Sequence, residues 1–421
     1  MTNPLPPGRR RLVLAALMLG GFAMGISLFT VGGFLPDMAR DLLPDGWATD
    51  PDAAIGSAGW VVTAFTLGAV AGAPLVAATT GRLARKHLLL ALVAVLVTSS
   101  VLVAVSPTFG MVVTARFLNG IPFGVYVSTA ILVASSLMPP GQRGRGVGMV
   151  TVGAPLAALI GAPVATAAGQ LLGWRIVFAL IAAAFALAFA AIAVAVPWQP
   201  GNPGAGIRAE ATALRLPQVW LAVAFGVLGF GGMFAVITYI APIATIVTGL
   251  PADAVPLVQV ALGLGLTVGS LAGGWLVDHS VPRALLGFVI GMTLAVAGFR
   301  LFAHTVVGLL VFTALIGFFN AGTAAATQVR MIDIAKNAQA FGAALNQSAL
   351  SLGHSTGSFL AGAAIAYGLG YQAPAVVGTV ISAVGVIIVV VALSLERANR
   401  NSHVPPATRS ATSPARSVLS R

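Results

Sequence analysis

Two ionisable side chains, Arg116 and His354, fall well inside the long apolar stretches of this 421-residue sequence. A charged group in the hydrocarbon layer of a membrane is costly unless it faces protein or water, so such residues usually have a functional role. An unperturbed histidine titrates near neutral pH, and His354 could therefore take up and release a proton. Each residue also has a structural interpretation. Arg116 could extend to the membrane interface, and His354 could be a hydrogen-bonded packing residue.

Acidic residues are absent from the middle of every apolar stretch. A membrane-embedded carboxylate with a raised pKa is the usual proton carrier. Asp37 stands at the outer end of the first stretch, directly after Pro36, and we take it with Arg116 and His354 as the candidates for proton coupling. The ten acids lie near stretch ends, in connecting segments or in the tail: Asp37, Asp41, Asp45, Asp50, Asp52, Glu210, Asp253, Asp278, Asp333 and Glu396.

The pattern of reactive residues does not favour an enzyme. The chain has no cysteine, and its five histidines, at 87, 279, 304, 354 and 403, are far apart in the sequence. The HExxH and P-loop patterns are absent, and so are the repeated filter loops of channels. We therefore expect no catalysis, metal or cofactor, and an ion gradient as the energy source. The net charge of +12 comes from scattered basic clusters without interleaved aromatics, which argues against a nucleic-acid partner.

The composition indicates an all-α membrane protein. Hydrophobic residues make up 58% of the chain and charged residues 8%, whereas a soluble domain has roughly 25% charged residues. A helix of ~20 apolar residues crosses the ~30 Å hydrocarbon layer with its backbone hydrogen bonds satisfied internally. We expect twelve transmembrane helices, at approximately residues 12–36, 57–79, 88–106, 110–137, 146–170, 174–197, 217–243, 256–277, 282–303, 305–329, 340–366 and 372–394.

The spans divide six and six around a polar segment rich in Pro, Gly and Asn. This division predicts an N-terminal six-helix bundle over 1–197, a cytoplasmic linker over 198–216 and a C-terminal six-helix bundle over 217–396. The segment 397–421 is rich in Ser, Pro, Ala and Arg, and we expect a disordered cytoplasmic tail. On this map 18 of the 22 Lys and Arg lie on the side of the N-terminus, which predicts that both termini are cytoplasmic.

The two halves carry a faint internal repeat, as expected for a transporter built from duplicated bundles. Chance matching among 50 glycines is the alternative explanation. At an offset of 197 residues, the matches are Gly68 with Gly265, Gly72 with Gly269 and Lys86 with Arg283.

Three motifs together indicate a family. The segment from Gly273 to Arg283 is similar to a G-x-L-x-D-R-x-G-R element and keeps its aspartate and its last arginine, and the segment from Arg116 to Gly124 reads R-F-x-x-G-x-x-x-G. The fifth span ends in Gly-Gln-Leu-Leu-Gly-Trp-Arg, up to Arg175. These motifs resemble the major facilitator superfamily, and within it the drug:proton antiporter branch that includes arabinose efflux and chloramphenicol efflux permeases. The resemblance runs over nearly the whole chain and implies two six-helix bundles around a central cavity that opens alternately to each side.

The resemblance implies a charged latch between neighbouring helices. Asp278 at a helix end can make a charge-assisted contact with an arginine such as Arg283. The first-half copy keeps its basic residues but has Gly81 where the family usually has aspartate, and anchoring of basic loops at the membrane is the alternative there. The latch candidates are Arg82, Arg85, Lys86, Asp278 and Arg283.

The fifth span resembles the antiporter signature, and this resemblance favours export. Its small residues and its proline let two helices approach closely and bend, which is also what a purely structural contact would need. The residues expected to serve this packing are Gly153, Gly161, Pro163 and Gly169.

The first span departs from the family pattern. Leu28 occupies the position of the acidic residue in the G-x-x-E-F stretch of the family. Without that carboxylate, proton coupling is weakened as a hypothesis, and an uncoupled facilitator or importer of sugars or other small solutes becomes the alternative.

The expected substrate cavity combines aromatic, methionine and polar side chains. Aromatic and methionine surfaces adapt to varied amphipathic ligands, and polar groups in hydrocarbon must find partners or line a wet cavity. Helix packing is the alternative role for each residue. We predict a monomeric, proton-coupled exporter of small amphipathic or drug-like molecules in the bacterial plasma membrane, with a membrane-embedded enzyme as the alternative of another class. The cavity candidates are Phe29, Arg116, Asn119, Phe123, Tyr126, Met233, Tyr239, Asn320, Asn346, Gln347 and His354.

Overall fold

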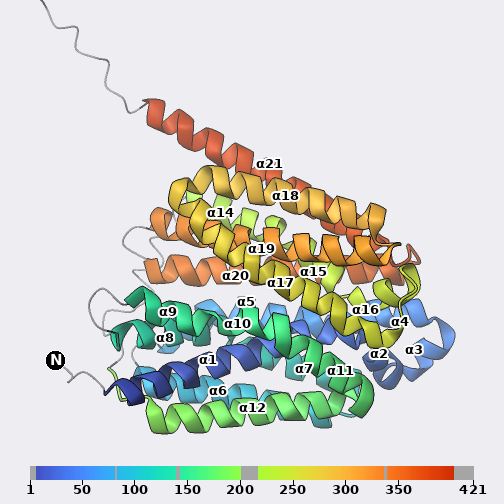
Figure 1. The fold of residues 1–421 in the computed structure, drawn as a ribbon, viewed down its shortest axis with the longest axis horizontal. Helices are drawn as coiled ribbons and strands as arrows, with labels where there is room; N and C mark the ends of the chain where they lie inside the picture. The colour runs from blue at the N-terminus through green and yellow to red at the C-terminus, as the bar shows by residue number, and fades with distance from the viewer. Residues whose placement is uncertain (1–5, 81–82, 139–142, 201–216, 336–338, 403–421) are drawn as a thin grey trace, which may run out of the picture.

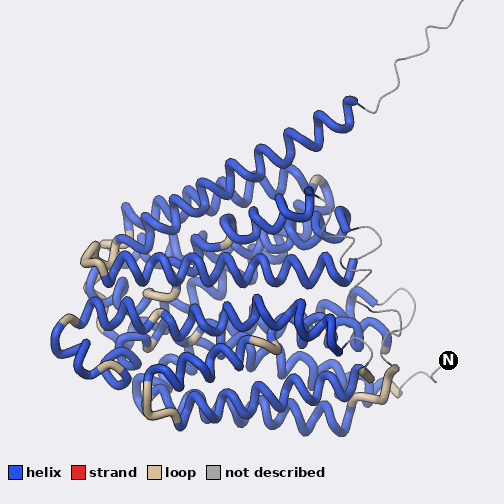
Figure 2. Tube along the Cα trace, turned by 180° about the vertical axis from the view of Figure 1, so that it is seen from behind, coloured by secondary structure: helices blue, strands red, loops and turns tan. Residues whose placement is uncertain are grey.

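The computed structural model describes residues 6–80, 83–138, 143–200, 217–335 and 339–402. Every regular element within these ranges is helical (Figure 2). An apolar chain surrounded by lipid has no water to satisfy its backbone N–H and C=O groups, and a helix satisfies them internally. The helical expectation is therefore confirmed.

The first half of the chain runs from α1 to α12. The Asp50 carboxylate accepts hydrogen bonds from the backbone N–H groups of Asp52 and Ala53 and so caps the start of α4. Gly173, with a φ of 91°, makes the sharp turn between α11 and α12. The elements are α1 (Pro7–Phe29), η1 (Val31–Gly33), α2 (Leu35–Leu42), α3 (Pro44–Thr49), α4 (Pro51–Ala58), α5 (Trp60–Thr80), α6 (Arg85–Val105), α7 (Phe109–Gly120), α8 (Phe123–Ser136), α9 (Arg143–Thr151), α10 (Gly153–Leu156), η2 (Ala157–Gly161), α11 (Ala162–Leu172) and α12 (Trp174–Ala195).

The second half repeats long helices, with one broken span. Pro242 has no N–H to offer the carbonyl of Thr238, and the helix bends by 51° at this point, between the segments Ala224–Ile237 and Ile240–Val247. The elements are α14 (Pro217–Gly229), α15 (Gly231–Ile237), α16 (Ile240–Pro242), η3 (Ile243–Val247), η4 (Ala252–Ala254), α17 (Val255–His279), α18 (Val281–Phe302), α19 (Val306–Ala335), α20 (Gln339–Ala366) and α21 (Ala373–Ser402).

Ten helices of the described chain are long and apolar enough to cross a membrane, and the bent pair raises the number to eleven. The 28-residue helix α20 lies at the place of the eleventh expected span, 340–366, but it is not among them. Its sequence carries many hydroxyl, amide and imidazole groups, which lower its hydropathy. Helices thus lie at the expected positions of the twelve spans. One of them, α20, is more polar than the helices that are apolar enough to cross a membrane.

The internal repeat is confirmed by matching backbone contacts. α5 crosses α7 in the first half as α17 crosses α19 in the second half. At each crossing two glycines face a carbonyl of the other helix so closely that a Cβ atom would overlap it. The same offset of 197 residues relates both partners of each contact. The contacts are Gly68 with Phe117, Gly72 with Ile121, Gly265 with Ala314 and Gly269 with Phe318.

The predicted domain boundaries fall partly outside the described residues. Residues 201–216 of the expected linker and residues 403–421 of the expected tail are among those not described. α21 continues to Ser402, so residues 397–402 are helical where the sequence predicted disorder. The start of α1 and the end of α21 lie at the same end of the molecule (Figure 1).

The two halves meet along two seams. α4 and α5 pack against α20, while η2 and α11 pack against α17. Gly263 on α17 faces the backbone of Leu159 in η2, which allows the helices to approach closely. The first-half helices lie below those of the second half in Figure 1, with α2, α3 and α4 at the end opposite the termini.

Candidate functional site

Arg116 on α7 is completely buried, with 0% of its surface exposed. Its Nε donates a hydrogen bond to the carbonyl of Val61 on α5 at 3.2 Å, and its Nη1 donates to Oγ of Ser27 on α1 at 2.8 Å. The guanidinium therefore points into the first half and does not extend to the membrane interface.

Asn119, one turn further along α7, extends this polar cluster to α6. Its amide nitrogen donates to Oγ of Ser99 at 2.8 Å and to Oγ of Ser100 at 3.0 Å, and its Oδ1 accepts from Ser27 at 3.1 Å. Three connected side chains thus join α1, α5, α6 and α7. Buried networks of this kind hold the orientation of their members when each is satisfied.

The positive charge of Arg116 is stabilised without an acid. The Cζ atom lies 4.4 Å from the ring centroid of Phe65 and 5.5 Å from that of Phe178, within the range of cation–π attraction. Among the described residues, no carboxylate forms an ion pair with Arg116, and its Nη2 has no hydrogen-bond partner. One donor nitrogen is therefore available inside the first half.

His354 lies where α20 meets α1 and α15. Its ring stacks on Phe234 with centroids 3.9 Å apart and meets the edge of Phe230 at 6.3 Å. Phe29 of α1 contacts Phe234 from the other side at 6.4 Å. The Nε2 atom of His354 is buried and has no hydrogen-bond partner, while the ring itself packs against the two phenylalanines.

Hydroxyl groups line the seam between α5 and α20. Oγ1 of Thr66 and Oγ of Ser355 lie 2.6 Å apart, and Oγ1 of Thr63 donates to Oγ of Ser358 at 3.3 Å. Nearer the termini, Ser348 donates to the carbonyl of Val70 at 3.3 Å. These bonds explain why α20 is polar, since its hydroxyl groups serve the contact between the two halves.

The amide side chains of α19 and α20 form a second polar group. Asn346 donates from Nδ2 to Oε1 of Gln328 at 2.6 Å, while its own Oδ1 has no partner. Asn320 is buried and its Oδ1 also lacks a partner. Gln347 is half-buried beside Asn346. Polar atoms left unpaired in this way are costly, so they mark places that a ligand or water can satisfy.

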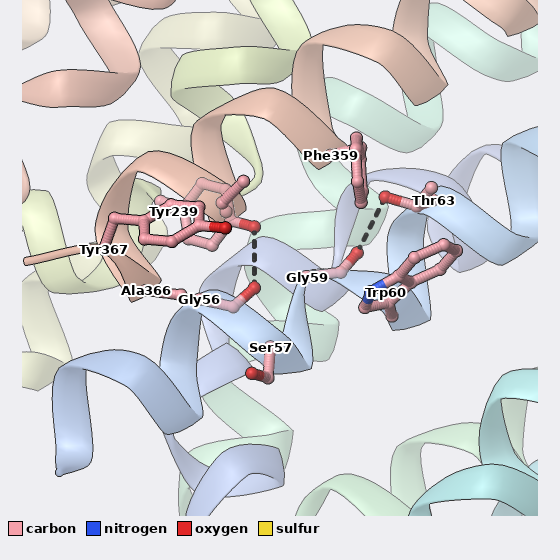
Figure 3. Close-up of a pocket in the computed structure, with 11 residues that line it drawn as sticks. Gly56, Ser57, Gly59, Trp60, Thr63, Tyr239, Phe359, Ala366 and Tyr367 are labelled. Carbon is pink, nitrogen blue, oxygen red and sulfur yellow. Dashed lines mark hydrogen bonds between the residues drawn. The ribbon is translucent and has the colours of Figure 1, made fainter.

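At the end opposite the termini, two tyrosines join the halves. The hydroxyl of Tyr239 contacts the carbonyls of Gly56 and Ser358, each at 3.2 Å, and Figure 3 shows the bond to Gly56. The hydroxyl of Tyr371 donates to Oδ1 of Asp52 at 2.6 Å. The bonds from Tyr239 to Gly56 and from Tyr371 to Asp52 cross from one half to the other, so this end is closed in the structure.

Asp37 lies on α2, beyond the end of α1. Burial raises the pKa of its carboxyl, while Arg40, whose Nη2 is 3.2 Å from Oδ1, acts in the opposite direction. Asp37 makes no hydrogen bond to Arg116 or His354. The structure therefore does not bring the three candidates for proton coupling together.

Several expected cavity residues are packed inside the halves. The Tyr126 hydroxyl donates to the carbonyl of Leu17 at 2.8 Å, and the Phe123 ring meets Phe65 with centroids 5.6 Å apart. Met233 is buried. A role in substrate contact requires these side chains to become accessible in another state of the protein.

Among the described latch residues, Arg85, Lys86, Asp278 and Arg283, no ion pair forms. Asp278 and Arg283 are exposed, and no ion pair forms between them. Lys86 instead donates from Nζ to the carbonyl of Ala193 near the end of α12, at 2.7 Å. The backbone N–H of Arg85 donates to the carbonyl of Gln199. Arg82 lies outside the described residues.

The small residues of the fifth span pack against α1. Gly153 faces the backbone of Met18, and Gly161 faces Ile26. Gly169 faces the ring of Phe34. Pro163 cannot offer an N–H to the carbonyl of Leu159, and a π-helical turn, η2, forms there.

Sequence reasoning missed the hydroxyl partners of these groups. Ser27, Thr66 and Ser355 are common residue types in membrane helices, and their pairing depends on how the helices rotate against one another. A usable signal was the recurrence of Ser351, Ser355 and Ser358 every three or four residues, which places them on one face of a helix.

Comparison with known proteins agrees with this architecture. The sequence pattern of the Major Facilitator Superfamily matches residues 17–305 and 246–421. The inner membrane transport protein YdhP of Escherichia coli (strain K12) is 28% identical over 376 residues, which cover 89% of this chain and 94% of that protein. The chloramphenicol resistance protein of Streptomyces lividans is 27% identical over 369 residues, covering 86% of this chain and 91% of that protein.

A solved structure shares the fold. The crystal structure of a D-xylose-proton symporter superposes with a TM-score of 0.67 over 89% of this chain and 97% of that chain. The sequence identity is 17%, so this likeness concerns the fold alone.

Proposed function

Because this chain belongs to the Major Facilitator Superfamily and is a multi-pass membrane transporter, we propose that it exports small amphipathic or drug-like molecules in exchange for protons. The observation that carries the proposal is the buried, unpaired Nε2 of His354 at the meeting of α1, α15 and α20. The similarity to a chloramphenicol resistance protein supports a drug-like substrate. Both termini face the cytoplasm and the protein works as a monomer in this proposal.

Alternating access uses the seams between the halves. The end near α2 to α4 is held by the bonds of Tyr239 and Tyr371, and opening that end requires these bonds to exchange with water. Each is a single hydrogen bond with a net contribution of roughly 1 kcal/mol, or about twice that where the acceptor is charged. A few such contacts can be broken and remade during each transport cycle.

Proton coupling follows from the surroundings of His354. Its Nε2 is buried without a hydrogen-bond partner, so a protonated ring would leave a charged N–H group unsatisfied there. The neutral form is therefore favoured in the closed arrangement, and a proton binds when water reaches the ring from one side. This difference between states links the proton to the conformational change.

Arg116 is expected to act from inside the first half. Its free Nη2 can bind an acceptor group when α1 and α7 shift, and the bonds to Ser27 and Val61 hold the guanidinium in place for this contact. The cavity residues Asn320, Asn346 and Gln347 supply amide groups from the second half in the same proposal.

An uncoupled facilitator or importer is the second candidate. Leu28, which stands where the family resemblance predicts an acid, is buried among apolar residues. A transporter that lost its coupling carboxylate and gained no substitute would equilibrate its solute without proton exchange.

Transport in proteoliposomes separates the two candidates. Counterflow and pH-gradient-driven transport are measured with hydrophobic cations, phenicol antibiotics and pentoses, with and without an uncoupler. Accumulation against a gradient that the uncoupler abolishes supports the antiporter. Equilibration that is indifferent to the uncoupler contradicts antiport and supports the facilitator.

A further inference from the structure

A cavity of about 230 Å³ lies on the seam between α4, α5 and α20, on the side of α2 to α4 (Figure 3). Its walls come from both halves of the molecule. Trp60 belongs to α5 in the first half, whereas Phe359 and Tyr367 come from α20 and the residue after its end in the second half. We call this cavity the seam groove. None of its lining residues is Arg116 or His354.

The seam groove has an aromatic rim that faces outward. Trp60 is 42% exposed and Phe359 is 41% exposed, and their rings meet edge to face with centroids 5.2 Å apart. Tyr367 is 86% exposed, just beyond the end of α20. Since α4 and α5 form a segment over Pro51–Gly72 that is long and apolar enough to cross a membrane, we expect lipid at this rim.

The chemistry of the seam groove changes along its length. Eight residues of helix separate Phe359 from Tyr367, which corresponds to a depth of ~12 Å. The outer end carries the exposed hydroxyl groups of Ser57 and Tyr367. Further in, the Tyr239 hydroxyl is bonded to Gly56 and Ser358, and the remaining wall includes Ala363 and the aromatic rim. A polar outer end above an apolar slot matches an amphiphile that enters chain first.

We propose that the seam groove binds one acyl chain of a phospholipid, from the leaflet on the side of α2 to α4. The headgroup stays at the level of Ser57 and Tyr367, and the chain lies in the cavity against Trp60, Phe359 and Ala363. Because the two walls belong to different halves, the chain contacts both only while α5 and α20 are together. A bound chain therefore favours the state that is closed on this side.

Photolabelling of the full-length protein in lipid nanodiscs tests the proposal. The probe is phosphatidylethanolamine with a diazirine at the middle of one acyl chain, and labelled peptides are identified by mass spectrometry. We expect labelling concentrated on the peptides of Trp60 and Phe359, and saturation when unlabelled phosphatidylethanolamine is added. The variant Ala363→Phe fills the slot and should lower this labelling at least fivefold. The matched control Ala186→Phe adds the same ring at an exposed position of α12 and should not change it.

Several results would overturn the proposal. Labelling spread evenly over the lipid-facing helices, or labelling unchanged by Ala363→Phe, means that the slot is not a chain site. Stronger labelling by diazirine-oleic acid than by the phospholipid means that the ligand is a free fatty acid. Displacement of the phospholipid by a transported drug means that the slot belongs to the substrate path. If Ala363→Phe does not fold, the smaller Ala363→Leu is measured in its place, with the same expected direction.

Discussion

The crossing of α5 with α7 and the crossing of α17 with α19 have the same backbone contacts but different chemistry. In the first half, Arg116 stands at the crossing and donates hydrogen bonds to groups of two neighbouring helices, α1 and α5, and to Asn119 of its own helix. At the offset of 197 residues, the second half has Thr313, whose buried hydroxyl has no hydrogen-bond partner. Asn119, which completes the cluster, corresponds to Ile316.

This difference shows that the two halves share the close helix packing at the crossing but not its polar side chains. Glycines at the two crossings are needed wherever two helix backbones touch, so both halves keep them. A buried guanidinium needs hydroxyl and carbonyl partners on several helices at once, and only the first half supplies them. The second half instead places its polar groups on α20, along the seam and around His354.

Replacing Arg116, the buried cation of the first half, should have the largest effect on transport. In Arg116→Met the apolar volume remains and Ser27 can still bond Asn119, so we expect transport to fall about tenfold or more. Thermal stability should be unchanged or slightly raised, because a buried charge replaced by an apolar group of similar size is often neutral or stabilising, by ~1 kcal/mol or more. Transport assays and unfolding of the purified protein check both expectations. Arg300→Met, at an exposed arginine of α18, is the control. Equal losses of transport in both variants would show that Arg116 has no specific role in transport.

Replacing His354 should abolish the coupling of transport to the pH gradient more than it slows the movement of substrate. In His354→Ala we expect the pH gradient to lose its effect on accumulation, while counterflow of the substrate continues. His279→Ala, at an exposed position at the end of α17, should keep full coupling. A pH dependence of transport unchanged in His354→Ala excludes His354 as the proton carrier.

The repeated glycines should respond alike in the two halves. In Gly68→Ala or Gly265→Ala the new Cβ overlaps a carbonyl of the crossing helix, so each variant should lose ~1–3 kcal/mol of stability. Gly274→Ala, where nothing lies within 4 Å of the new atom, is the control and should lose none. Unfolding of the three variants in detergent checks this. A large effect in one half alone would show that the crossings are not equivalent.

The hydrogen bond between Tyr371 and Asp52 should stabilise the closed state of the end near α2 to α4. Burial raises the pKa of Tyr371, and the hydrogen bond to Asp52 and the charges of Asp52 and Asp50 act in the same direction. The phenol thus stays protonated above the usual tyrosine pKa of roughly 10. The stabilisation by this bond is fully present below that pH and is lost only as pH rises through the higher pKa of the folded state.

Tyr371→Phe should therefore open this end at all pH values below about 10, at a cost of ~1–3 kcal/mol for the lost bond. The chain has no native cysteine, so a single Thr30→Cys can report access of a polar maleimide from that side. We expect faster labelling in Tyr371→Phe and no change in Thr305→Val, at an exposed position between α18 and α19 that takes no part in this contact. Equal labelling rates in all three proteins contradict the closure by Tyr371.

The smallest effect should come from Thr313, the counterpart of Arg116. Thr313→Val removes an unpaired buried hydroxyl at constant shape, so stability should stay equal or rise by ~1 kcal/mol. Transport should be unaffected. Thr323→Val, whose hydroxyl donates to the carbonyl of Phe319 at 2.7 Å, should instead lose stability. A loss of transport in Thr313→Val would mean that both helix crossings contribute to transport. It would contradict the difference between the two halves.

The sequence predicted the scaffold well because its signals are local. Runs of apolar residues located the helices, and the glycine repeat at 197 residues indicated the duplication of the two halves. Arg116 and His354 stood out because ionisable groups are rare in such runs. The family resemblance and the fold were both confirmed.

The partners of these residues were not predictable in the same way. Ser27 and Val61 reach Arg116 only because α1 and α5 turn particular faces toward α7. Tyr371 and Asp52 are separated by more than three hundred residues, and they lie before α21 and in the first turn of α4, where no periodic pattern indicates a contact. The end of α21 was misjudged for a related reason, since a polar sequence following a helix can continue it to Ser402.

Proton release on substrate binding tests proton antiport most directly. A substrate identified by counterflow is added to the detergent-solubilised protein in weakly buffered solution, and a pH-sensitive dye follows the proton. We predict acidification with the wild-type protein, with a maximum amplitude near the pH at which half of the protein is protonated, and its loss in His354→Ala. Substrate binding without any pH change at any starting pH would contradict antiport and leave an uncoupled transporter.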